Sequence, residues 1–125
     1  MKNFFAADIY VKIHPNKIEI KNISASKEWE TAHAEKAFTT TRLLVGSFSE
    51  AEPLLTKLMK KAVSGRLLKN IRALVQPMDK VEGGLSEIED RIFKELAVSA
   101  GARSVVVHIG AELTDDDAIS KINGA

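Results

Sequence analysis

The chain has 125 residues, which is enough for one domain with a buried core, and we expect residues 1–125 to form a single domain. Hydrophobic residues make up 45% of it and the formal net charge is +1, so composition gives no whole-molecule reason to expect nucleic acid or a membrane as partner. The chain has no cysteine, which excludes disulfides and thiolate chemistry. No apolar run approaches the ~18 residues of a membrane span, and Met1–Phe5 is too short for a signal peptide, so we expect a cytoplasmic protein.

Two β-strands joined as a hairpin are predicted first. Residues 7–13 and 17–23 both alternate between apolar and polar side chains, which is typical of strands with one buried face. Between them, Pro15 fixes φ and Asn16 tolerates the left-handed geometry of a turn. The side chains expected to face the core are those of Ile9, Val11, Ile13, Ile18 and Ile20.

A third, weaker strand is predicted within residues 28–40. Its alternation is incomplete, and the β-branched run Thr39–Thr41 closes it. Residues 32–37 contain good helix formers, so a helix is the competing prediction for that part.

The remaining elements alternate between helices and strands. A helix is predicted after a cap at Ser47 or Ser49, with a stop at Gly65, and a short strand follows at residues 71–75. The capping box of Ser86 and Glu89 begins a second helix, which ends at Gly101. Its apolar stripe is expected to comprise Ile88, Ile92, Phe93, Leu96, Ala97 and Ala100.

The last strand and the last helix complete the pattern. Residues 104–109 are nearly all apolar, as expected of a strand covered on both faces. Thr114, followed by three aspartates, begins a short helix that stops at residues 123–124. The order β-β-β-α-β-α-β, with a short C-terminal helix, predicts an α/β protein with a mixed sheet and helices on both faces.

This order and several short segments resemble the bacterial actin MreB. In one part of that family, a strand that ends in proline is followed by a helix, an Ala-Gly-Ala-Arg turn and an apolar strand. The same order is found here from Arg72–Pro77, through a loop and a helix with an acidic start, to Ser99–Val106. Tyr10–Lys21 resembles the first hairpin of the family. The resemblance covers nearly the whole of this chain but about a third of an MreB chain. It implies a ribonuclease-H-like fold, as in the nucleotide-binding subdomain of actin-like ATPases.

The resemblance fails where the family binds ATP. The Asp-x-Gly-Thr pattern of its first hairpin, which serves phosphate and Mg²⁺, is replaced here by Lys12-Ile13-His14-Pro15. Pro15 has no N–H to donate to a phosphate, and the chain lacks the half of the fold that carries the second phosphate loop. We therefore expect no cofactor, no catalytic residue and no enzymatic activity.

Other residue groups give weak signals for chemistry. The histidines His14, His33 and His108 have no close spacing that suggests a metal site. The acids of residues 115–117 are expected to serve a helix start rather than a metal. A ribonuclease-like nuclease would need an acid on the opening strand, where Lys12 stands.

The most uneven charge is basic. Between Lys57 and Gln76 no acid interrupts a set of cations that forms a possible interaction surface: Lys57, Lys60, Lys61, Arg66 and Lys69. This surface could meet an acidic protein partner, anionic lipid or RNA, although it lacks the aromatic residues that single-strand binders use for stacking. The alternative is that these cations form a solvated helix face with no binding role.

The sequence favours a non-catalytic interaction or assembly module over an enzyme. A lone subdomain of a larger fold leaves a free sheet edge, for which the third strand is a natural candidate, so we expect a protein partner or a homodimer. The MreB resemblance implies a possible link to cell shape or envelope organisation. Two alternatives stay open: a nucleotide-binding protein or ATPase with an unorthodox site, and binding of anionic lipid or nucleic acid through the basic helix.

Overall fold

The computed structural model describes residues 6–25, 28–63 and 70–124. Within these residues the chain forms strands and helices in the predicted order. They are β1 (Ala6–His14), β2 (Lys17–Asn22), β3 (Glu30–His33), α1 (Phe48–Ala62), β4 (Asn70–Pro77), α2 (Glu87–Ser99), β5 (Ser104–Val107) and α3 (Asp115–Asn123).

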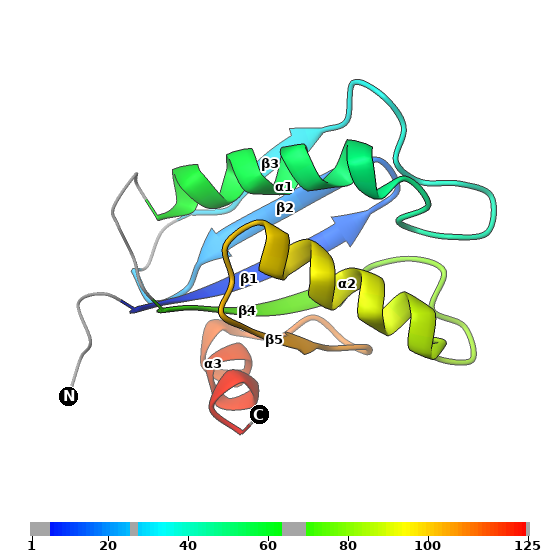
Figure 1. Ribbon diagram of the computed structural model, residues 1–125. Helices are drawn as coiled ribbons and strands as arrows, with labels where there is room; N and C mark the ends of the chain where they lie inside the picture. The colour runs from blue at the N-terminus through cyan, green and yellow to red at the C-terminus, as the bar shows by residue number, and fades with distance from the viewer. Residues whose placement is uncertain (1–5, 26–27, 64–69, 125) are drawn as a thin grey trace.

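The described strands form one mixed sheet in the order β3-β2-β1-β4-β5 (Figure 1). β1 and β3 both pair antiparallel with β2, whereas β4 pairs parallel with both β1 and β5. Val11 on the central strand lies opposite Ile20 of β2 and Val75 of β4. The prediction of a mixed α/β sheet is therefore confirmed, with β3 and β5 at its two edges.

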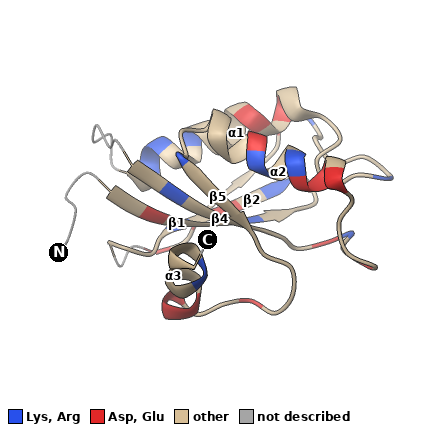
Figure 2. Ribbon diagram, turned by 60° about the horizontal axis from the view of Figure 1, so that its bottom comes forward, with Lys and Arg blue, Asp and Glu red and all other residues tan. Residues whose placement is uncertain are grey.

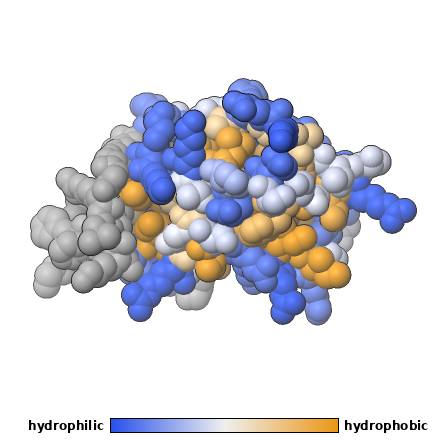
Figure 3. All heavy atoms as spheres, turned by 45° about the horizontal axis from the view of Figure 1, so that its top comes forward, coloured by the Kyte–Doolittle hydropathy of each residue, from blue (hydrophilic) through white to orange (hydrophobic). Residues whose placement is uncertain are grey.

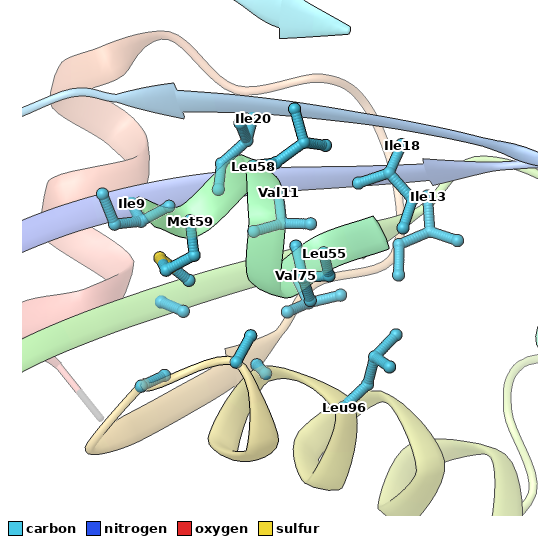
Figure 4. Close-up of a cluster of buried hydrophobic side chains, with 14 of the residues drawn as sticks. Ile9, Val11, Ile13, Ile18, Ile20, Leu55, Leu58, Met59, Val75 and Leu96 are labelled. Carbon is cyan, nitrogen blue, oxygen red and sulfur yellow. The ribbon is translucent and has the colours of Figure 1, made fainter. Parts of the chain in front are cut away.

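Helices cover both faces of this sheet. α1 and α2 pack on one face, where Ile9, Val11 and Ile13 of β1 meet Leu55 and Met59 of α1 and Leu96 of α2 (Figure 4). α3 packs on the opposite face, where Ala118 and Ile122 contact Tyr10 of β1 and Leu74 of β4. The larger of the two apolar clusters therefore lies under α1 and α2.

The helix caps follow the sequence closely. Ser86 and Glu89 form the predicted capping box of α2, and the side chain of Thr114 accepts a hydrogen bond from the backbone of Asp117. Ser47 is the N-cap of α1, but its side chain makes no capping hydrogen bond. The predicted stop at Gly65 lies outside the described residues.

The prediction that β1 has one buried face is wrong. Asp8 and Tyr10, on the face expected to meet solvent, are 7% and 0% exposed. Asp8 is paired with Arg72, whose Nε and Nη2 each donate across 2.8 Å, while Tyr10 is covered by the segment that leads into α3. The alternation along β1 therefore identified the face that packs under α1 and α2, but it gave no sign that another part of the chain covers the opposite face.

The prediction of a strand within residues 28–40 is correct for only four residues. Asn16 Oδ1 accepts hydrogen bonds from the backbone N–H groups of Phe38 and Thr39, both at 2.9 Å. These bonds draw the chain away from the sheet after His33, and Phe38 becomes fully buried. The competing helix is also absent, because residues 34–46 form bends and turns.

Two further expectations about apolar residues are corrected. β5 ends at Val107, and its valines are only half-buried because it lies at the edge of the sheet rather than between two strands. Ile88, expected in the apolar stripe of α2, is 70% exposed. It lies in the first turn of α2, and the buried residues of this helix are Phe93, Leu96 and Ala97.

Asn16 has two roles, because it adopts the left-handed turn conformation and its side chain accepts two backbone hydrogen bonds. Two substitutions should separate these roles. Asn16 has a φ of 54°, so Asn16→Gly keeps the turn conformation while removing the acceptor for two backbone donors. We expect this variant to lose about 1–3 kcal/mol of stability in urea unfolding. Asn16→Ala should lose ~1 kcal/mol more, because an alanine at positive φ is strained. Wild-type stability of the glycine variant would contradict the role assigned to the amide.

Candidate functional site

An open groove of about 540 Å³ lies between β3 and α1. One wall is the edge strand with the residues that follow it, and the other wall is the outer side of α1. The lining residues are Glu30–Lys36 from the strand side and Glu50, Pro53, Leu54, Lys57, Leu58 and Lys61 from the helix. Such a volume lies in the range of ligand-binding clefts, about 300–1,000 Å³.

The strand wall presents unpaired backbone groups. The N–H of Ala34 donates to the carbonyl of Asn16 at 2.9 Å, which continues the β2–β3 ladder. Antiparallel pairing alternates along a strand, so Ala32 and Glu30 also direct their backbone groups to β2. The N–H and C=O groups of Thr31 and His33 therefore point away from the sheet, and no described strand pairs with this edge.

The floor of the groove is apolar. Ala32 is the only β3 side chain that is half-buried on the α1 side, and its small size leaves space beneath the helix. Leu58 is 4% exposed and Leu54 is half-buried, so both contribute apolar surface from α1. The C-terminal end of α1 is fixed to the sheet by a 3.1 Å hydrogen bond from Asn22 Nδ2 to the carbonyl of Ala62.

Charges of both signs border the groove. Lys57 and Lys61 lie in the C-terminal half of α1 and Glu50 in its first turn, so blue and red separate along this helix in Figure 2. Lys61 Nζ lies 3.3 Å from Glu30 Oε2, in an exposed pair that contributes little stability. This pair places the basic half of α1 beside the start of β3. Glu35, two residues after the end of β3, also lines the groove.

The predicted basic surface is divided by the structure. Lys57 and Lys61 line the groove, whereas Lys60 is exposed on α1 without lining it. Arg66 and Lys69 lie outside the described residues. Figure 3 looks onto the side that carries α1 and α2, where hydrophilic side chains surround patches of apolar surface.

Lys12 lies on the opposite face of the sheet. Its Nζ is 2.5 Å from Glu112 Oε1, 4.2 Å from the centre of the Trp29 ring and 5.5 Å from that of Tyr10. The side chain is only 13% exposed, so the ammonium is enclosed by one carboxylate and two aromatic faces. The hydrogen bond from Lys12 lowers the pKa of Glu112 below its ordinary value.

A buried hydrogen-bond network next to Lys12 was not predicted. Tyr10 Oη donates to Gln76 Oε1 and accepts from the backbone N–H of Leu113 at 3.1 Å, and Gln76 Nε2 donates to the carbonyl of Gly110 at 2.8 Å. The network fixes the segment before α3 to β1 and β4. The one signal in the sequence was a glutamine directly after the apolar run Ala73–Val75, because a buried amide needs partners.

The three histidines lie in different surroundings. His14 Nε2 is 2.6 Å from Glu19 Oε1, His33 is exposed on β3, and buried His108 places Nε2 2.8 Å from the carbonyl of Ala111. In the part of the chain that the structure describes, no three histidine, aspartate or glutamate side chains are grouped as metal ligands would be. The first of the three aspartates, Asp115, pairs with Lys21 at 3.0 Å.

No helix among the described residues has the length and apolar character that crossing a membrane requires. No model of a known protein family matches the sequence. The chain is similar to the uncharacterized protein YjaA of Escherichia coli (strain K12), with 27% identity over 120 residues. The match covers 89% of this chain and 92% of YjaA, so it spans nearly the full length of both proteins.

The contact between Lys12 and Glu112 predicts a dependence of stability on pH. A carboxyl group whose pKa is lowered by folding stabilises the protein above its unfolded pKa, and this contribution is lost as the pH falls through the folded pKa. We expect Glu112→Gln to be less stable than wild type at neutral pH and equally stable well below the ordinary value of 4.5. Urea unfolding at both pH values measures the difference.

The matched control is Glu95→Gln. Glu95 is also exposed and lies 3.9 Å from its nearest cation, Arg91, so its loss should change stability little at either pH. A Glu112→Gln variant that behaves like this control would show that the contact with Lys12 does not stabilise the fold.

Proposed function

We propose that this protein is a non-catalytic interaction module that takes up an extended polypeptide segment along β3, in the groove beneath α1. The observation that carries the proposal is the open β3 edge, where the backbone groups of Thr31 and His33 point outward beside an open groove of about 540 Å³. Addition of a strand to a sheet edge is a recurrent mode of protein recognition, in which backbone hydrogen bonds supply affinity.

The groove suits a segment in the extended conformation. Successive side chains of a strand point to opposite faces, so every second side chain of an added strand would enter the space between β3 and α1. There it would contact Ala32, Leu54 and Leu58. The remaining side chains would lie beside Thr31 and His33 on the other face. A small or apolar side chain opposite Ala32 would therefore be favoured.

Non-catalytic function is supported by the surroundings of Lys12. This residue stands where the MreB family places the aspartate of its phosphate hairpin, and its ammonium is already engaged by Glu112 and Trp29. A cation in such contacts is not free to bind a nucleotide phosphate. The proposal therefore needs no cofactor.

We also propose that the fold is a ribonuclease-H-like subdomain of the actin-like type. The strand order β3-β2-β1-β4-β5, in which β2 alone runs opposite to its neighbours, supports this assignment together with the order of the elements. A role in bacterial cell shape or envelope organisation would follow from the MreB resemblance, and the β3 groove would then be the surface through which the protein joins an assembly.

A photo-crosslinking amino acid at position 33 tests the proposal. His33 is exposed at the β3 edge, so the substitution should preserve the fold, and irradiation in living cells should yield a covalent adduct with whatever polypeptide lies along β3. The same amino acid at position 60 is the control, because Lys60 is exposed on α1 but does not line the groove. Adducts from position 33 and none from position 60 are expected. No adduct from position 33, or equal yields from both, would contradict the proposal.

A further inference from the structure

We infer that the segment bound along β3 is β3 of a second copy of this chain, paired antiparallel about a two-fold axis. This inference rests on the proposed function of the β3 groove and names its occupant. The argument has three parts, which concern the backbone, the charges and the position of α1.

The backbone groups of β3 are self-complementary. A two-fold axis at Ala32 places Thr31 opposite the partner's His33, and both residues direct N–H and C=O groups outward. This register pairs all the outward groups of both strands. It also keeps Ala32 on the same face in both copies, so the sheets continue into one another with their α1 helices on one side.

The charges of the groove favour a second copy over a strongly charged partner. Its lining contains three acids and three bases, namely Glu30, Glu35, Glu50, Lys36, Lys57 and Lys61. A segment of one charge sign would be attracted at one end and repelled at the other. An antiparallel copy instead brings the basic C-terminal half of α1 beside the acidic N-terminal half of the partner's α1.

The position of α1 fits the same arrangement. α1 contacts both β2 and β3 and runs antiparallel to β3 (Figure 1). Neighbouring strands lie about 4.8 Å apart, so α1, centred over β2 and β3, lies about half a spacing inside β3. The proposed axis lies about half a spacing outside β3, which puts α1 roughly one strand spacing from the axis. The two copies of α1 would then lie about 10 Å apart, the separation at which helices pack. Pro53 and Leu54 would meet their counterparts across the axis.

Analytical ultracentrifugation over a range of concentrations tests the inference. Wild type should sediment as a species of twice the 13.7 kDa chain mass. Thr31→Pro removes an outward N–H and leaves the backbone bonds to β2 in place, although it also removes the 3.4 Å hydrogen bond from the Thr31 hydroxyl to Glu19. This variant should raise the dimer dissociation constant about tenfold or more. Thr31→Val, which keeps the N–H and loses the hydroxyl, should dimerise like wild type. A dimer unaffected by Thr31→Pro would overturn the inference.

Charge exchange gives a second test that does not depend on the proline variant folding. Lys57→Glu combined with Lys61→Glu should weaken dimerisation, and so should Glu50→Lys in a separate chain, because each creates like-charge contacts twice across the axis. Mixing the two variants should restore a dimer, which is then a heterodimer. Lys60→Glu, outside the groove, should change nothing. Failure of the mixture to associate would overturn the inference.

The crosslinking experiment separates this inference from the proposed function. An adduct between two copies from position 33 supports both. An adduct with a different protein, together with a monomeric wild type, overturns self-pairing and leaves the groove as a binding site. A monomeric wild type with no adduct overturns both.

Discussion

Burial of β1 on both of its faces is the constraint on which the other elements depend. β1 pairs with β2 and β4, its isoleucines and Val11 pack under α1 and α2, and Tyr10 packs under α3. A strand covered in this way occupies the centre of the sheet, which leaves β3 with β2 as its one described partner. The exposed edge that we propose as the binding surface is therefore a consequence of how the core is filled.

The elements could be predicted from the sequence where the signal was local. Alternation identified β1 and β2, and the Ser86 capping box identified the start of α2. Prediction failed where a distant segment decided the outcome. Tyr10 is buried because its hydroxyl binds the backbone of Leu113, 103 residues away, and no period along β1 can indicate that contact. The β-branched run Thr39–Thr41 likewise did not extend β3, because tertiary hydrogen bonds to Asn16 outweigh local strand propensity.

The candidate site could be predicted only in part. The run of cations that begins at Lys57 was evident, but a run of like charge in the sequence does not specify a surface of one sign. The fold places Lys57 and Lys61 on the groove beside acids from other segments, Glu30 and Glu35, and turns Lys60 away from it. The groove itself depends on the placement of α1 over β3. That placement is decided by the packing of Leu55 and Met59 and by the contact of Asn22 with the end of the helix.

The same contacts that shorten β3 would also favour the pairing that we propose for it. Asn16 holds residues 38 and 39 beyond one end of β3, and all four residues of β3 pair with β2, so β3 is ordered without a strand on its outer side. A strand that is already ordered loses little conformational entropy when a second strand adds to it. Long exposed edges tend to associate non-specifically. The β3 edge is only four residues long, and α1 beside it carries charges of both signs, so few partners and few registers would fit it. The hydrogen bonds of Asn16 therefore shorten β3 and, in the pairing that we propose, also limit the registers open to it.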